Sequence, residues 1–146
     1  MNTKENVLSK LTTGLKHERL AYKIYGIVSL VLAIILIIFG ALVMISDVNA
    51  VTNRIISAHL TLGTAYISLD SNLLLLGYGC IVLAIAIVNL VRASRIGKYR
   101  IDETLTIKQT SSVSSIVMPA IFNDVALVFA IINFVNAKKN SEVLNA

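Results

Sequence analysis

The residue whose type and surroundings most suggest chemistry is Asp124, a carboxylate within the otherwise apolar residues 113–137. A charge at the centre of a membrane helix costs about 2.5–3.5 kcal/mol, so such groups mark ion or proton sites, pores or contacts with a partner. Asn123 and Asn133 share this stretch and Asn89 lies in another, so their amides are the available hydrogen-bond partners. These four residues form the candidate intramembrane polar or partner site. Alternatively, the chain breaks at Asn123 and Asp124, and the acid lies in water at a hairpin tip.

Enzymatic and metal chemistry have little support in the sequence. His59 is expected outside the membrane with Asp47 and Asp70, but their spacing is not typical of a catalytic or metal site. His17 is expected on the opposite side, and Cys80 is the single cysteine. The motifs HExxH, CxxC, GxSxG, GxGxxG and the Walker sequence do not occur. We therefore expect no enzyme, no cofactor and no metal; a membrane enzyme that uses His59 and the outer aspartates is a third hypothesis.

The composition is that of a membrane protein. Of the 146 residues, 56% are hydrophobic and 14% are charged, whereas a soluble domain carries about 25% charged residues. The net charge of +5 comes from basic residues that flank apolar stretches, and no aromatic platform or recognition motif accompanies them, which argues against nucleic-acid binding. We expect an all-α, small multi-pass transmembrane protein of a bacterial cell membrane, forming a single integral-membrane domain over residues 1–146.

Three apolar stretches are long enough to be spanning helices, and these must position the polar side chains. Residues 24–45 carry no charge, and as a helix they cover about 33 Å, more than the hydrocarbon core of about 30 Å. Residues 73–91 form the second predicted span, with Asn89 as its strongly polar member. Residues 113–137 form a third span that is polar, and residues 138–146 follow it as a tail.

Residues 46–72 are predicted to be an external segment. Within them, residues 55–69 are apolar but cover only about 22 Å as a helix, too short to cross. With three spans and a cytoplasmic N-terminus, ten of the thirteen basic residues are cytoplasmic, as the positive-inside rule requires. Two alternatives remain open. Residues 55–69 could be a fourth span, or 113–137 could be a helical hairpin that returns the tail to the cytoplasm, leaving two spans.

Residues 1–23 are predicted to form a cytoplasmic amphipathic helix. Val7, Leu11 and Leu15 recur at helical spacing opposite a set of lysines, a pattern typical of a helix lying on an anionic lipid surface. The alternative is a solvated charged segment that only fixes the topology.

Residues 92–112 are predicted to be a basic cytoplasmic loop. The second helix should continue into them and end near Gly97 as a C-cap. Apolar and polar residues then alternate on both sides of Asp102 and Glu103, which predicts a small β-hairpin.

Small residues mark the faces on which the spans should pack, because membrane helices associate along such stripes. In 113–137 the spacing alternates between four and three, as in a left-handed helix pair. This seam could pack within the chain, or it could dock on a partner or on another copy. The three stripes are Gly26, Ser29, Ala33 and Gly40; Gly77, Cys80 and Ala84; and Pro119, Asn123, Ala126, Ala130, Asn133 and Ala137.

These patterns favour a non-enzymatic membrane protein that acts through protein–protein interaction in the membrane. Its partner would be another integral membrane protein or itself, and an accessory or regulatory subunit or a toxin-immunity factor would fit. The alternative is a self-assembling pore, holin-like in size, or an ion or solute transport subunit, in which Asp124 and the asparagines line a water-filled path.

Overall fold

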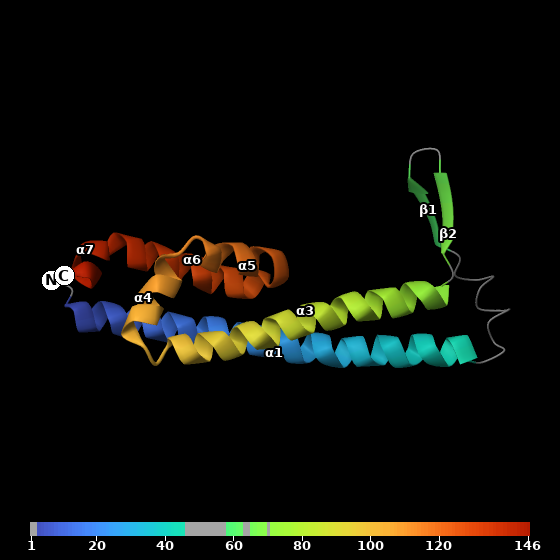
Figure 1. The fold of residues 1–146 in the computed structure, drawn as a ribbon, viewed down its shortest axis with the longest axis horizontal. Helices are drawn as coiled ribbons and strands as arrows, with labels where there is room; N and C mark the ends of the chain where they lie inside the picture. The colour runs from blue at the N-terminus through green and yellow to red at the C-terminus, as the bar shows by residue number, and fades with distance from the viewer. Residues whose placement is uncertain (1–2, 46–57, 63–64, 70) are drawn as a thin grey trace. The chain divides into compact units, whose positions relative to one another are not determined.

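The structure, a computed structural model, is mostly helical. It describes residues 3–45, 58–62, 65–69 and 71–146. The chain divides into two compact units, Met1–Ile27 with Ile87–Ala146 (unit 1) and Val28–Ala86 (unit 2). Figure 1 labels the elements, which are α1 (Lys4–Ile45), β1 (Ala58–Leu62), β2 (Ala65–Leu69), α3 (Ser71–Tyr99), α4 (Glu103–Ser111), α5 (Ser114–Phe122), α6 (Asp124–Lys139) and α7 (Ser141–Asn145).

Among the described residues, two helices are long and apolar enough to cross a membrane. They are α1 over Lys4–Leu42 and α3 over Leu74–Tyr99. The whole helices, Lys4–Ile45 and Ser71–Tyr99, include the predicted spans 24–45 and 73–91. Helix α1 runs without interruption from Lys4 to Ile45, so the predicted amphipathic segment 1–23 and the first span are one continuous helix.

The third predicted span is two helices. Asn123 has an extended backbone and ends α5, and its side-chain oxygen accepts a hydrogen bond from the Ala126 amide at 3.0 Å, which caps the start of α6. At about 1.5 Å per residue, the 9 residues of α5 and the 16 of α6 are each shorter than the hydrocarbon core. The prediction of one continuous helix over 113–137 is therefore wrong. The hairpin alternative describes these residues, because the asparagine cap overrides helix continuation.

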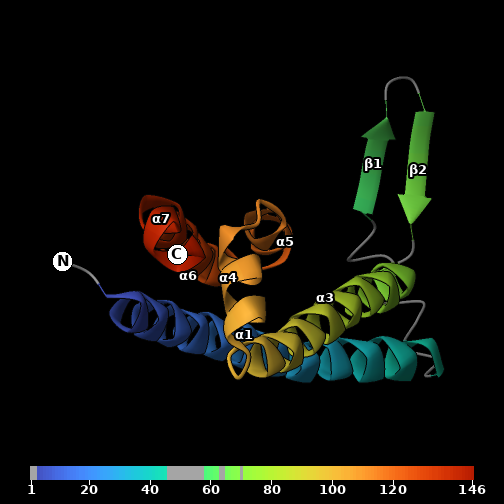
Figure 2. The ribbon, with the colours of Figure 1, turned by 60° about the vertical axis from the view of Figure 1, so that its left-hand side comes forward.

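The described part of segment 46–72 is a β-hairpin. Strands β1 and β2 pair antiparallel, in a register from Ala58 opposite Leu69 to Leu62 opposite Ala65 (Figure 2). A fourth helical span over 55–69 does not agree with these extended strands. Residues 71 and 72 begin α3, and residues 46–57, 63–64 and 70 of that segment lie outside the described residues.

The predicted loop 92–112 is also mostly helical. Helix α3 continues to Tyr99, so Gly97 lies inside it and is not its cap. Helix α4 begins after Asp102, whose carboxylate accepts a hydrogen bond from the Leu105 amide at 3.0 Å. The prediction of a β-hairpin here is wrong, because an aspartate N-cap followed by a glutamate in the first turn favours a helix over the short alternating pattern.

In unit 1, the chain's own helices cover the apolar face of residues 1–23. Val7 and Leu11 are buried in one cluster with Ala137 of α6 and Leu144 of α7. Leu15 is buried in a second cluster with residues of α3 and α6. The chain itself therefore covers the apolar side chains of this face, and contact of residues 1–23 with an anionic lipid surface stays a prediction.

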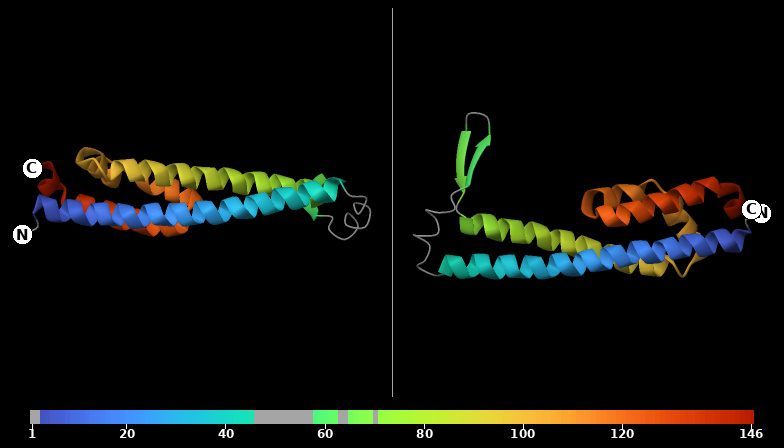
Figure 3. Two further views of the ribbon diagram at one scale, coloured as in Figure 1. Left: turned by 90° about the horizontal axis from the view of Figure 1, so that it is seen from below. Right: turned by 180° about the vertical axis from the view of Figure 1, so that it is seen from behind.

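In unit 2, α1 and α3 pack antiparallel through glycines. A Cβ added at Gly40 would lie 3.0 Å from the Leu76 side chain, and one added at Gly79 would lie 2.8 Å from the Ile37 side chain. Each helix therefore presents glycine where the other presents a large side chain, which brings the two backbones close. Figure 3 shows α1 and α3 side by side from two further directions.

Candidate functional site

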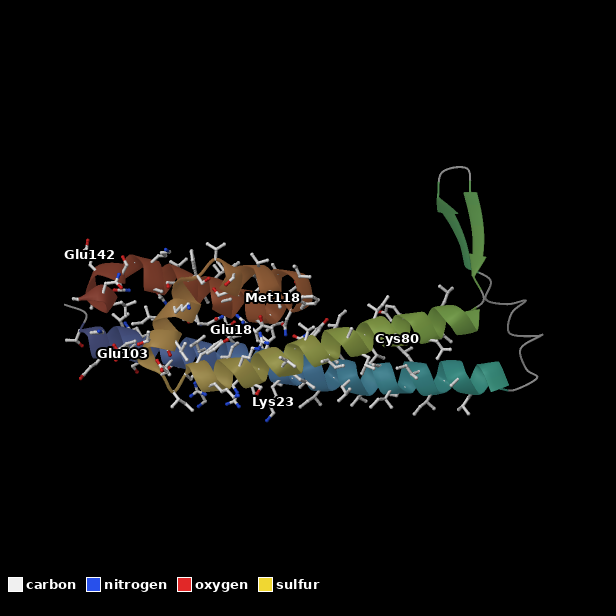
Figure 4. All side chains as sticks on the ribbon, in the orientation of Figure 1. Glu18, Lys23, Cys80, Glu103, Met118 and Glu142 are labelled. Atoms are coloured by element: carbon white, nitrogen blue, oxygen red, sulfur yellow. The ribbon has the colours of Figure 1, made fainter. Side chains whose placement is uncertain are left out.

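A buried polar cluster in unit 1 is the candidate site. Glu18 has 1% of its surface exposed and Tyr22 also 1%. They lie on the α1 face that carries Val7, Leu11 and Leu15, one and two turns further along. In Figure 4, Glu18 lies on the side of α1 toward α6, and Lys23 points away from it. The helix thus places a carboxyl group and a phenol where the pattern otherwise calls for apolar side chains.

Asn133 of α6 reaches the cluster because α1 has a glycine opposite it. A Cβ added at Gly14 would overlap Asn133 Oδ1. Asn133 is 2% exposed. Gly14 therefore makes the room in which this amide packs against α1.

Arg92 of α3 completes the cluster. Burial raises the pKa of Glu18 from 4.5 to about 7, while attraction to Arg92 and the nearby Asn133 amide lower it. Glu18 precedes the uncharged residues 24–45 and is followed by Arg19 and Lys23, so it lies before the predicted span. With such a pKa, the carboxyl group exchanges a proton near neutral pH.

The cluster is rich in buried atoms without hydrogen bonds. Within the described part of the chain these include Glu18 Oε1, Tyr22 OH, Arg92 Nε and Asn133 Nδ2. A buried polar atom without a partner costs about 1–3 kcal/mol. These four atoms come from three helices, α1, α3 and α6, so the cluster is a site where desolvated polar groups of unit 1 gather.

A second polar contact joins the α5–α6 turn to α3. Asn123 donates from Nδ2 to Asn89 Oδ1 at 2.9 Å and to the Ala21 carbonyl at 3.4 Å. Asn89 donates to the Phe122 carbonyl at 3.4 Å. Both side chains are buried. Two of the four residues predicted from the sequence are therefore together, and they hold the turn of the hairpin in place.

The other two predicted residues are separate from this pair. Asp124 is exposed in the first turn of α6, where a negative charge suits the helix dipole. Asn133 packs beside Glu18 and Gly14. The four do not form one polar site, because the break at Asn123 turns Asp124 outward.

The predicted packing stripes have different outcomes. In α1, Gly26, Ser29, Ala33 and Gly40 are all buried. In α3, the predicted Gly77, Cys80 and Ala84 are exposed, and a Cβ at Gly77 would meet nothing within 4 Å. The buried residues of α3 also recur at alternating spacings of three and four, but on another face; they are Gly79, Val82, Ala86, Asn89, Ala93 and Ile96.

The seam on 113–137 is buried within unit 1. Its use as a docking surface for a partner does not fit the structure, because α1 and α3 already occupy it. The buried seam residues are Pro119, Asn123, Ala126, Ala130, Asn133 and Ala137.

Glu18, Tyr22 and Arg92 were not predicted from the sequence as site residues. The available signal was a glutamate in the apolar face of residues 1–23, at a position that helical spacing places beside Leu15 and Tyr22.

The histidines and carboxylates of the described residues are spread over several elements. Among the described residues no three His, Cys, Asp or Glu side chains group closely enough to hold a metal ion. His17 stacks on Phe129 with ring centroids 5.7 Å apart. The hypothesis that His59 acts with Asp47 and Asp70 concerns side chains outside the described part. Comparison with protein-family models, curated proteins and solved structures finds no match for this chain.

Proposed function

We propose that this chain is a small non-enzymatic membrane protein that acts by binding another integral membrane protein, as an accessory or regulatory subunit or a toxin-immunity factor. The observation that carries the proposal is the outer face of α6. Val125, Val128, Ile132 and Val135 recur there at spacings of three and four, and each is about half exposed. This face lies opposite the buried seam of the same helix.

Helix α6 is too short for contact with lipid along a membrane span to account for its exposed apolar face. Lipid covers the exposed apolar side chains of a spanning helix, but 16 residues do not span a bilayer. Helix α5 is also too short to span, and it exposes Val117 and Ile121 in the same way. Large apolar patches on elements that do not cross the membrane are typical of protein interfaces. We therefore assign the outer face to a partner protein.

The packing of unit 1 supports a topology with both ends of the chain on the cytoplasmic side. Val7 and Leu11 near the start are buried against Ala137 and Leu144 near the end, so these segments lie on the same side of the membrane. With spans at 24–45 and 73–91 and a hairpin over 113–137, every basic residue except Arg54 is then cytoplasmic.

Affinity purification at native expression level tests the function. The informative variant is the double change Val128→Ser and Ile132→Ser, matched by Val31→Ser and Ile35→Ser, which has the same spacing and exposed positions on α1. A membrane protein should co-purify stoichiometrically with the unchanged chain and with the α1 variant, and fall at least about tenfold with the α6 variant. Absence of a stoichiometric partner, or equal loss in both variants, would overturn the proposal.

The pore alternative has less support. It requires Asp124, Asn123 and Asn133 to line one water-filled path, but Asn123 and Asn133 are buried inside unit 1 while Asp124 is exposed. A change in ion flux on Asp124→Asn would bring this alternative back.

A further inference from the structure

A groove in unit 1 combines an apolar wall with two arginines. It encloses about 360 Å³ and is lined by Ile87, Val88, Val91, Arg92, Arg95 and Met118. Five of these residues come from consecutive turns of one face of α3, and Met118 comes from α5, where Figure 4 labels it. The volume is at the small end of the range for ligand sites, about 300–1,000 Å³.

The apolar and charged linings follow one another along the helix. Residues 73–91 carry no charge, and Arg92 is the first charged residue after them. The groove therefore extends from the end of the predicted second span into the cytoplasmic interface. A ligand that fits this order has an anionic group at one end and hydrocarbon at the other.

The two arginines differ in how they are held. Arg92 is half-buried, and its charge attracts the Glu18 carboxyl group from the cluster behind it. Arg95 is exposed, and the ion pair found in the described part of the chain, Lys4 with Glu103 at 3.0 Å, does not involve it. A fixed guanidinium beside an exposed one can bind a phosphate through several N–H donors with little ordering cost.

We propose that this groove binds one anionic phospholipid of the cytoplasmic leaflet, with its phosphate at Arg92 and Arg95 and the start of its acyl chains along Val88, Val91 and Met118. Basic pockets at the cytoplasmic ends of membrane helices are suited to such headgroups. The small volume admits the glycerophosphate region, while the acyl chains continue into the bilayer. This site is separate from the outer face of α6 and does not depend on a partner protein.

Fluorescence quenching by lipid tests the site directly. The chain has no tryptophan, so Met118→Trp places a single tryptophan in the groove, which can be excited selectively over the tyrosines. The variant is reconstituted in phosphatidylcholine vesicles that contain a small fraction of either phosphatidylglycerol or phosphatidylcholine with brominated acyl chains. Brominated phosphatidylglycerol should associate about fivefold more strongly than brominated phosphatidylcholine, the preference expected for one basic residue near the surface.

The matched controls are on the same helix. Adding Arg95→Gln should abolish the preference for phosphatidylglycerol, whereas adding Lys98→Gln should keep it, because Lys98 is also exposed and cationic but does not line the groove. Equal quenching by the two lipids, or equal loss in both glutamine variants, would overturn the proposal. So would displacement of the lipid by millimolar inorganic phosphate, which would indicate a site for free phosphate.

A second measurement uses the unmodified chain, in case the tryptophan disturbs the groove. Native mass spectrometry after detergent extraction from mixed vesicles should show one retained phosphatidylglycerol per chain. This lipid should be lost in Arg95→Gln and retained in Lys98→Gln. Retention of phosphatidylcholine at the same level would contradict a site for anionic lipid. Since the purified chain is alone in both experiments, failure here leaves the proposed partner binding unaffected, and the reverse also holds.

Discussion

The two units of this protein use the same two helices but pack them by different means. In unit 2, glycines of α1 and α3 face Leu76 and Ile37, and the fit is one of size. In unit 1, Gly26 packs against Leu90 in the same way, but the same helices also bury Glu18, Asn89 and further amides from α6 and the α5–α6 turn. Small residues suffice in the contact of unit 2. In unit 1 polar groups are buried as well, and their desolvation must be offset by local partners.

The largest expected effect comes from removing the charge of Glu18. Because burial raises the folded-state pKa from 4.5 to about 7, the folded state holds more protons than the unfolded state between these pH values. Stability is therefore full below pH 4.5 and falls as the pH rises through 7, by about 3 kcal/mol in total.

Glu18→Gln should abolish this pH dependence and make the protein more stable than the unchanged chain at pH 8. Denaturant unfolding in detergent, followed by circular dichroism from pH 4 to pH 9, measures both. Glu142→Gln, a change at an exposed residue of α7, is the control and should leave the slope intact. If stability depends on pH to the same extent in Glu18→Gln, the buried Glu18 is not the cause, and the comparison of the two units fails at this point.

The size fit in unit 2 is tested by two glycines two residues apart. In Gly79→Ala, the new Cβ would lie 2.8 Å from the Ile37 side chain and 3.3 Å from its backbone nitrogen, so we expect about 1–3 kcal/mol of destabilisation from overpacking. In Gly77→Ala, nothing lies within 4 Å, and stability should stay the same or rise by up to about 1 kcal/mol from helix propensity. Unfolding in detergent measures both, and equal effects would contradict the assigned packing face.

The asparagine at the hairpin turn should have a smaller effect. Asn123→Ala removes the cap on α6 and the contact with Asn89, and should destabilise unit 1 by about 1–2 kcal/mol. Asp124→Asn, one residue further, is the control and should change stability by less than about 1 kcal/mol, since it only weakens a favourable charge at the helix start. Hydrogen exchange of the α6 amides checks the site of the effect, which should be the first turn of α6.

The smallest expected effect is at the surface of unit 1. The Lys4–Glu103 ion pair, at 3.0 Å, joins two side chains that are 41% and 53% exposed, and such pairs contribute about 0–1 kcal/mol. Lys4→Gln should therefore lower the unfolding midpoint by an amount near the error of the measurement at physiological salt. A loss comparable to that of Asn123→Ala would mean that surface charge, and not the buried amides, holds unit 1 together.

Local signals in the sequence predicted several features for clear reasons. The uncharged residues 24–45 and 73–91 lie within the two helices that are long and apolar enough to span a membrane. The spacing of Gly26, Ser29 and Ala33 coincides with the buried face of α1. The break at Asn123 was open to prediction because an asparagine followed by an aspartate is a helix-start signal, although the apolar length of 113–137 favoured one helix.

Other features depend on which parts of the chain meet. Helix α3 has small residues on two faces, and only the opposing Leu36 and Ile37 of α1 select the face with Gly79 over the face with Gly77. Likewise, the seam on 113–137 fitted a partner helix as well as the chain's own helices until the fold placed α1 and α3 against it.

The sequence by itself determined the apolar lengths, the charges that flank them and the N-caps at which α4 and α6 begin, because these depend on neighbouring residues and on the solvent. The tertiary structure decided that Glu18 is buried beside Arg92 and Asn133, that Asp124 is exposed, and that Arg92 and Arg95 line a groove with Met118. These are contacts between residues more than seventy positions apart or in different helices, and their free energy appears only when the helices pack together.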